Sequence, residues 1–205
     1  MKIILASKSA RRRDILSNLG IDFTVRVSDA DESFPDPPSP ECFAETVSCR
    51  KALAVLEMLK GEEDFNPDET LIIASDTVVE CGGVILGKPN DKADAAAMMR
   101  LLSDKRHRVI SGIAVSYRGK TVSSHESTAV TFRALSEQDI EQYVSTDEPY
   151  DKAGGYGIQD KAAIFVSGIQ GDYLNVVGLP VYRLFDVLKR VFGIEAFDII
   201  GKGSL

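Results

Sequence analysis

The sequence predicts an α/β fold, a mixed sheet with flanking helices, and three observations support it. Residues 71–79 read LIIASDTVV, an apolar run that does not alternate, as in a central strand buried on both faces. Segments with helical periodicity lie between strand-like segments along most of the chain. Hydrophobic residues make up 44% of the 205 positions, which is enough for one domain, or for one domain with a smaller lobe.

The first segment reads as a strand, a small polar turn and a helix. Residues 3–6 are apolar, Ser7 and Ser9 lie in the turn, and Gly20 ends the helix. Backbone N–H groups and the helix dipole favour an anion at such a junction. Residues 11–13 are all arginine, although the dipole disfavours positive charge there. This conflict predicts a phosphate-binding turn, the alternative being an exposed basic helix start.

The next segment pairs a strand with acidic residues. A strand predicted over residues 23–27 runs into Asp31 and Glu32. Carboxylates at a strand end can hold a divalent cation, although most such stretches are solvated loops. Four prolines in residues 34–40 forbid a continuous helix or strand. Residues 40–60 then show helical periodicity and carry Lys51, where a lysine is ordinarily a solvated surface residue.

Asp76 lies inside the predicted central strand. A buried carboxylate needs a cation, a metal or several hydrogen bonds to offset its lost hydration, although a lone acid would be read as a cap of the strand end. Gly82-Gly83 predicts a hairpin that returns Lys88 toward the level of Asp76. The spacing of the glycines and Lys88 also matches a phosphate-binding P-loop, but Pro89 stands where that loop needs Ser or Thr.

The second half of the chain is predicted to alternate in the same way. The glycine-rich residues 145–159 have the composition of a loop that approaches a ligand closely. The other predicted elements, in order, are a helix at 91–102, strands at 108–117 and 123–132, a helix capped by Ser136 and Asp139, strands at 164–169 and 173–177, and a helix at 181–191.

Composition narrows the classes of function. A net charge of −7 argues against a general nucleic-acid or membrane-surface binder, because both partners are polyanionic. Without an aromatic stacking platform, the three arginines are also a poor nucleic-acid site. Three cysteines without zinc-like spacing, and an apolar start too short for a signal peptide, predict a cytoplasmic protein. His107 and His125 have no evident catalytic partner and are expected to be structural or exposed.

Taken in order, the motifs resemble the Maf family of nucleoside triphosphate pyrophosphatases over roughly residues 2–192. Several motifs in one order are far more specific than any one of them alone. They are LAS-x-S-x-RR at 5–12, Asp31-Glu32, Arg50-Lys51-Ala52, SDTVV at 75–79, LGKP at 86–89, DEP-x-DKAG-x-YGIQ at 147–159 and VVGLP at 176–180.

The resemblance implies an elongated α/β fold similar to that of inosine triphosphatase, with two lobes around a nucleotide-binding cleft. Residues 1–192 would form one domain of two lobes, and residues 193–205 a peripheral tail. The implied activity is hydrolysis between the α- and β-phosphates to a nucleoside monophosphate and pyrophosphate. The resemblance also implies a homodimer. The alternative is a nucleotide-binding regulator of cell division with little or no turnover.

The chemistry of this reaction assigns roles to the polar residues. Asp76 would accept the proton of the attacking water, in agreement with the catalytic aspartate of the family. Glu32 would bind a divalent metal, magnesium or manganese, with Asp76 possible as a second ligand. The phosphates would be bound by Arg12, Lys51 and Lys88, helped by the backbone around Ser7 and Ser9.

The resemblance also implies a substrate. The subgroup acting on dTTP and UTP carries an arginine, a threonine and a glutamine at its selectivity positions, which correspond here to Arg11, Thr77 and Gln159. Threonine and glutamine side chains can both donate and accept hydrogen bonds, as the edge of a pyrimidine requires. Two positions depart from the family pattern: Ala10 replaces the usual proline, and Asp160 replaces a glycine.

Overall fold

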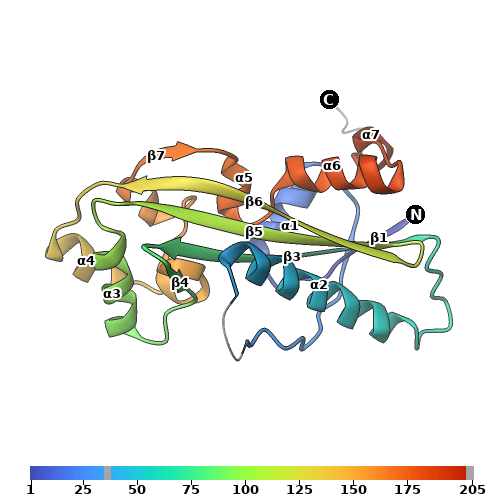
Figure 1. Ribbon diagram of the computed structural model, residues 1–205, viewed down its shortest axis with the longest axis horizontal. Helices are drawn as coiled ribbons and strands as arrows, with labels where there is room; N and C mark the ends of the chain where they lie inside the picture. Colours follow the sequence, from blue (N-terminus) through green and yellow to red (C-terminus); the bar gives the residue numbers. More distant parts are fainter. Residues whose placement is uncertain (35–37, 202–205) are drawn as a thin grey trace. The chain divides into compact units, whose positions relative to one another are not determined.

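The computed structural model describes residues 1–34 and 38–201 (Figure 1). In chain order the elements are β1 (Lys2–Leu5), α1 (Ala10–Asn18), β2 (Thr24–Val25), α2 (Pro40–Leu59), β3 (Thr70–Cys81), β4 (Val84–Leu86), α3 (Lys92–Leu102), β5 (Arg106–Tyr117), β6 (Lys120–Phe132), α4 (Glu137–Val144), the 3₁₀ helices η1 (Glu148–Asp151), η2 (Ala153–Gly155) and η3 (Lys161–Phe165), β7 (Val166–Gln170), α5 (Tyr173–Val177), α6 (Val181–Phe192) and α7 (Ala196–Ile199).

The strands form one mixed sheet, which confirms the predicted α/β class with flanking helices. Within the described residues the sheet has seven strands in the order β2-β1-β3-β5-β6-β7, and β4 pairs with β3. β1 runs parallel to β3 with Leu5 opposite Ile73. Farther along, β3 pairs antiparallel with β4, with Val79 opposite Leu86. β3 therefore pairs with β1 up to Ile73 and with β4 from Val79 onward, and Asp76 lies between these two stretches.

The chain divides into two compact units, each assembled from separate segments. Unit 1 comprises Met1–Asp76, Ser111–Glu126 and Gly178–Leu205, and unit 2 comprises Thr77–Ile110 and Ser127–Val177. The boundaries fall inside β3, β5 and β6, so each of these strands contributes residues to both units. The predicted nucleotide cleft between two lobes stays a prediction.

The core of unit 1 is formed between α2 and the first strands. Ala52, Val55 and Leu59 of α2 cluster with Ile72 and Ala74 of β3, and all five are buried. The sequence begins this helix well, because the Ser39 hydroxyl accepts from the Cys42 amide and Pro40 takes the first helical position. The helix is thereby held along β3 in the segment that leads to Asp76.

The core of unit 2 is built on the far end of β3. Val79 and Cys81 cluster with Met99 of α3, with Ile140 of α4 and with Tyr156. α3 and α4 lie side by side (Figure 1). The predicted capping box of α4 is confirmed, since Ser136 and Asp139 cap each other's backbone. The predicted turn at Gly82-Gly83 also joins β3 to β4.

One predicted strand is wrong. Residues Tyr173–Val177 form helix α5 instead, because Asp172 Oδ1 accepts from the Leu174 amide at 2.8 Å and starts a helical turn. The side-chain Nδ2 of the buried Asn175 then donates to the Val109 carbonyl at 2.9 Å, a contact that an apolar pattern does not reveal.

Other elements are shifted or shorter than predicted. Residues Lys161–Phe165 are a 3₁₀ helix, so the strand after them begins at Val166. β2 covers only Thr24–Val25. Residues 35–37 of the proline-rich segment and residues 202–205 of the predicted tail lie outside the described residues. Among the helices of the described residues, none is long and apolar enough to cross a membrane.

Gly112 of β5 packs directly against the backbone of α2, and this contact leads to a prediction about stability. A Cβ at Gly112 of β5 would overlap the Ala44 carbonyl of α2 and lie 2.6 Å from the Glu45 amide nitrogen. We expect Gly112→Ala to lower the free energy of unfolding by about 3 kcal/mol, measured by urea denaturation. Gly168→Ala is the control, because a Cβ there meets nothing within 4 Å. Equal stability of the two variants would contradict this packing.

Candidate active site

The predicted metal and catalytic residues of unit 1 meet at the Lys51 ammonium group. Its Nζ lies 2.7 Å from Asp76 Oδ1 and 2.9 Å from Glu32 Oε1. The Lys51 and Asp76 side chains are only 16% and 13% exposed, whereas Glu32 is 58% exposed. Lys51 is therefore not the solvated surface lysine that its place on a helix would suggest.

The packing of α2 on β3 explains this contact. Ala52, next to Lys51, is buried in the same cluster as Ala74 of β3. Asp76 lies two residues after Ala74 and so points to the same face of the strand. The cluster therefore sets Lys51 beside Asp76, and the ammonium charge compensates a carboxylate that has lost most of its hydration.

A second set of contacts surrounds Arg12 of α1. Arg12 is buried, and its Nε donates to the Gly178 carbonyl at 2.8 Å while Nη1 donates to Ser7 Oγ at 3.0 Å. The Ser75 hydroxyl donates to the same Gly178 carbonyl at 3.0 Å. Burial lowers the pKa of the Arg12 guanidinium, and the negative charge of Asp76 acts in the opposite direction. An arginine nevertheless stays charged in a protein.

The parallel register brings these residues to the same level of the sheet. Leu5 pairs with Ile73, and the Ala6 amide donates to the Ile73 carbonyl at 2.7 Å. Ser7 and Ser75 each lie two residues farther, just beyond the carboxyl ends of the paired segments. β1 ends at this level, whereas β3 continues to Cys81.

The predicted phosphate turn lies between β1 and α1. Ser9 is the N-cap of α1, its side chain makes no capping hydrogen bond, and its amide donates to Ser7 Oγ at 3.3 Å. Arg11 is half-buried, and Arg13 donates to the Lys8 carbonyl at 3.2 Å. The turn thus places the hydroxyl of Ser7 beside the Arg12 guanidinium, while the anion-binding function stays a prediction.

The carboxylates of Glu32 and Asp76 are oxygen ligands of the kind that a divalent cation prefers. Glu32 and Asp76 both contact one ammonium group, so they already converge on a single positive charge. The described residues hold no group of three or more His, Cys, Asp or Glu side chains that could bind a metal. Magnesium fits such a pair, because it is commonly bound by one or two carboxylates together with substrate phosphates.

The other predicted residues belong to unit 2. Thr77 is half-buried, whereas Lys88 and Gln159 are exposed. Val79 pairs with Leu86 in the antiparallel hairpin. Thr77, two residues before Val79, and Lys88, two residues after Leu86, therefore lie at the same level. Gln159 lies in the segment between η2 and η3.

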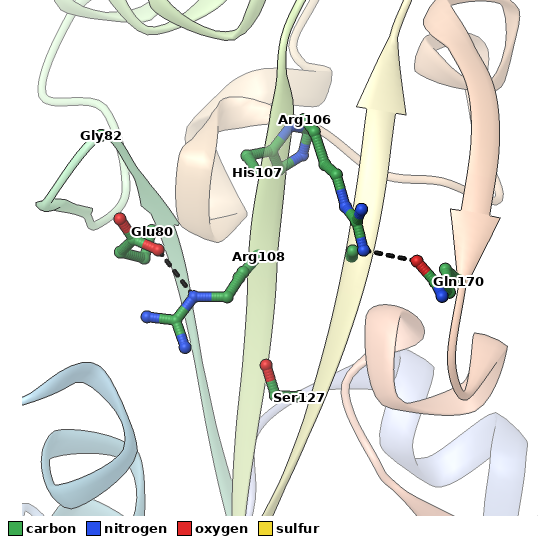
Figure 2. Close-up of a pocket in the computed structure, with 8 residues that line it drawn as sticks. Glu80, Gly82, Arg106, His107, Arg108, Ser127 and Gln170 are labelled. Atoms are coloured by element: carbon green, nitrogen blue, oxygen red, sulfur yellow. Dashed lines mark hydrogen bonds and ion pairs between the residues drawn. The ribbon is translucent and has the colours of Figure 1, made fainter.

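Unit 2 also has a polar cavity of about 510 Å³ over β3, β5, β6 and β7 (Figure 2). Arg108 points toward Glu80, and its Nε donates to Oε2 at 2.8 Å. Arg106 likewise donates to the Gln170 side chain. Both arginines of the cavity are thus engaged by side chains of the protein.

His107 also lines this cavity but is buried. Its Nε2 lies 2.7 Å from the Tyr156 hydroxyl, and its ring packs edge-on against the rings of Phe132 and Tyr156. Burial lowers the pKa of His107 to about 4. The other histidine, His125, pairs with Glu45 of α2.

Comparison with known proteins decides the family. The family described as Maf-like protein matches residues 2–191. The chain belongs to the Maf family. The resemblance of the motifs is thereby confirmed.

Relatives and a solved structure extend the comparison. Proteins from Bacillus anthracis, Bacillus cereus strain AH820 and Bacillus cytotoxicus, each named dTTP/UTP pyrophosphatase, are 44% identical over 189 residues. Each match covers 92% of this Maf chain and 95% of the relative. The structure of the Staphylococcus aureus Ham1 protein matches with a TM-score of 0.45 and 16% identity, over 64% of this chain and 72% of that chain.

Sequence reasoning missed part of the Maf site. Gly178 was only a motif marker, yet its carbonyl accepts from both Arg12 and Ser75. Its φ of 127° is one that glycine adopts readily, and a glycine directly before Leu-Pro in the motif was the available signal. Ser75 was likewise a motif residue without a role, and nothing in its local sequence reveals a partner 103 residues away.

The buried imidazole predicts a pH dependence of stability. The lowered pKa means that the unfolded chain binds a proton between about pH 6.5 and 4 and the folded chain does not. Stability is therefore lost as pH falls through this window, by up to about 3 kcal/mol. We expect His107→Gln to lose less stability than wild type between pH 7 and pH 4.5, measured by urea denaturation. Parallel losses in both proteins would contradict a neutral buried His107.

Proposed function

We propose that this protein hydrolyses dTTP and UTP to the monophosphate and pyrophosphate. The observation that carries the proposal is the cluster around Asp76. There a largely buried carboxylate, a second carboxylate and a lysine converge, and a buried arginine that donates to Ser7 interacts with the charge of Asp76. The relatives named dTTP/UTP pyrophosphatase, at 44% identity over nearly their whole length, support this substrate class.

The reaction requires charge neutralisation and a proton acceptor. Water attacks the α-phosphorus, the bond from this phosphorus to the oxygen that bridges to the β-phosphate breaks, and pyrophosphate leaves with the electron pair of that bond. Asp76 would accept the proton of the water, because its carboxylate is held in one orientation by the Lys51 ammonium. Arg12, Lys51 and Lys88 would neutralise the phosphates. The turn around Ser7 and Ser9 would add backbone donors.

A divalent metal fits the same cluster. Glu32 and Asp76 would hold magnesium or manganese, because both carboxylates already contact one positive charge. When bound, the ion would neutralise phosphate oxygens and so lower the cost of charge that develops in the reaction. Since Glu32 is 58% exposed, its carboxylate can change partners at little desolvation cost.

Base selectivity would come from Arg11, Thr77 and Gln159. Each can donate a hydrogen bond, and the threonine and glutamine can also accept one, as a pyrimidine edge requires. The exposure of Gln159 supports a role in contacting a ligand. The enzyme would be cytoplasmic, as its three cysteines without zinc-like or disulfide spacing predict, and a homodimer, as the family resemblance implies.

Replacement of the proton acceptor tests the mechanism. We expect Asp76→Asn to lower kcat for pyrophosphate release from dTTP and UTP by about 100-fold or more, because an amide cannot take the proton. Asp22→Asn, a change at an exposed position, is the matched control and should keep wild-type turnover. If wild type binds both nucleotides and releases no pyrophosphate with any metal, the nucleotide-binding regulator takes the place of the enzyme.

Metal removal tests the role of Glu32. Chelation with EDTA should abolish pyrophosphate release, and added magnesium or manganese should restore it. Loss of one ligand in Glu32→Gln should raise the metal concentration for half-maximal activity by about tenfold or more. Full activity of wild type in EDTA would refute metal assistance. An unchanged metal requirement in the variant would remove Glu32 from the ligand set.

A further inference from the structure

The turn that carries Gln159 is anchored on both sides by buried groups of unit 2. Before Gln159, Gly157 and Ile158 are buried, and after it the Asp160 amide donates to the Gly157 carbonyl at 3.2 Å. Gln159 itself is exposed. The side chain therefore stands at the tip of a short turn, and its position depends on whatever holds the two ends.

Glu148 of η1 holds the far end of this turn. Its Oε2 accepts from the Lys161 amide at 3.1 Å, and its Oε1 accepts from the Ala162 amide at 3.2 Å. The Tyr143 hydroxyl of α4 donates to Oε1 at 3.0 Å. Burial and the neighbouring Glu148 charge raise the pKa of Tyr143, so this hydroxyl remains a donor. Hydrogen bonds to a carboxylate are stronger than those between neutral groups.

Lys152 contacts the residue that follows Gln159. It is buried, and its Nζ donates to the Glu148 carbonyl at 2.8 Å and to Asp151 Oδ1 at 2.7 Å. Asp160 Oδ2 lies 3.6 Å from the same nitrogen. One buried ammonium thus connects η1 to the residue that directly follows Gln159.

Gly157 lets the turn fit against Lys152. A Cβ at this position would lie 2.5 Å from Asp160 Oδ2 and 2.6 Å from Lys152 Cε, so both side chains would have to move. The residues around Gln159 are thus confined by contact as well as by hydrogen bonds. Asp160, the departure from the family pattern, is part of this confinement.

We propose that Glu148 and Lys152 are positioning residues that hold Gln159 in place for reading the base. The inference rests on the proposed function, since it assigns to Gln159 the recognition of a thymine or uracil edge. Selectivity by hydrogen bonds requires a fixed partner, because a side chain displaced by about 1 Å loses much of the discrimination. The two residues would act through Gln159 and would not touch the base themselves.

The test compares two pyrimidine nucleotides that differ in the edge of the base. Cytosine carries an amino group where thymine and uracil carry a carbonyl, so the ratio of kcat/KM for dTTP to that for dCTP reports base reading. We expect Glu148→Gln and Lys152→Met each to lower this ratio between about tenfold and about 100-fold, mainly through KM for dTTP. Glu141→Gln, on the exposed face of α4, is the matched control and should leave the ratio unchanged.

A double-mutant cycle separates positioning from a general structural role. If Glu148 acts through Gln159, then Glu148→Gln should lower the ratio no further in a Gln159→Ala background. An equal loss for dTTP and dCTP, with the ratio kept, would overturn the inference. Tyr143→Phe removes only one of the three donors to the Glu148 carboxylate, so it tests the same network if Glu148→Gln does not fold. It should lower the ratio in the same direction by a smaller factor.

Binding of α,β-methylene analogues of dTTP and dCTP, measured by calorimetry, keeps the two proposals distinguishable. If wild type turns over no nucleotide, the proposed hydrolysis fails, but preferential binding of the dTTP analogue that is lost in Glu148→Gln would still support the positioning role. If wild type hydrolyses dTTP and the variant keeps the preference of wild type in both assays, the positioning role fails and the proposed hydrolysis stands.

Discussion

The candidate site depends on the parallel pairing of β1 with β3. With Leu5 opposite Ile73, Ser7 and Ser75 each follow two residues after this pair, Ser7 beyond the end of β1 and Ser75 inside β3. From there the Arg12 guanidinium reaches Ser7, and it shares the Gly178 carbonyl with Ser75. A shift of one residue in this register would turn the side chains of one strand to the opposite face and dismantle the cluster.

Pairing of opposite charges stabilises this cluster in a protein whose net charge is negative. Arg12 is buried at a cost in hydration, which is offset by its hydrogen bonds and by the negative charges of Asp76 and Glu32. Lys51 compensates the same two carboxylates from the side of α2. Positive and negative groups therefore neutralise one another in the folded protein. A triphosphate with its metal would bring the same two kinds of charge.

Local patterns in the sequence predicted much of the fold. The apolar run of β3, the glycines of the β3–β4 turn and the capping box of α4 each act within a few residues, and each was found. α5 was missed because its strand-like pattern is overridden by Asp172 and by the distant Val109 carbonyl.

In the site, residue types and motif order indicated Asp76 and Lys51. The part played by the Gly178 carbonyl depends on a partner 166 residues away in the sequence, which local reasoning cannot supply.

The interleaved make-up of the two units has a consequence for how the protein forms as it leaves the ribosome. Unit 1 needs the chain from Gly178 onward, and unit 2 needs residues up to Val177. Arg12 is thus synthesised long before the carbonyl that accepts its hydrogen bond. Both units include segments from the second half of the chain. Until these are synthesised, part of the apolar surface of the amino-terminal half stays exposed. Such long-range pairing slows folding and leaves the incomplete chain exposed to aggregation.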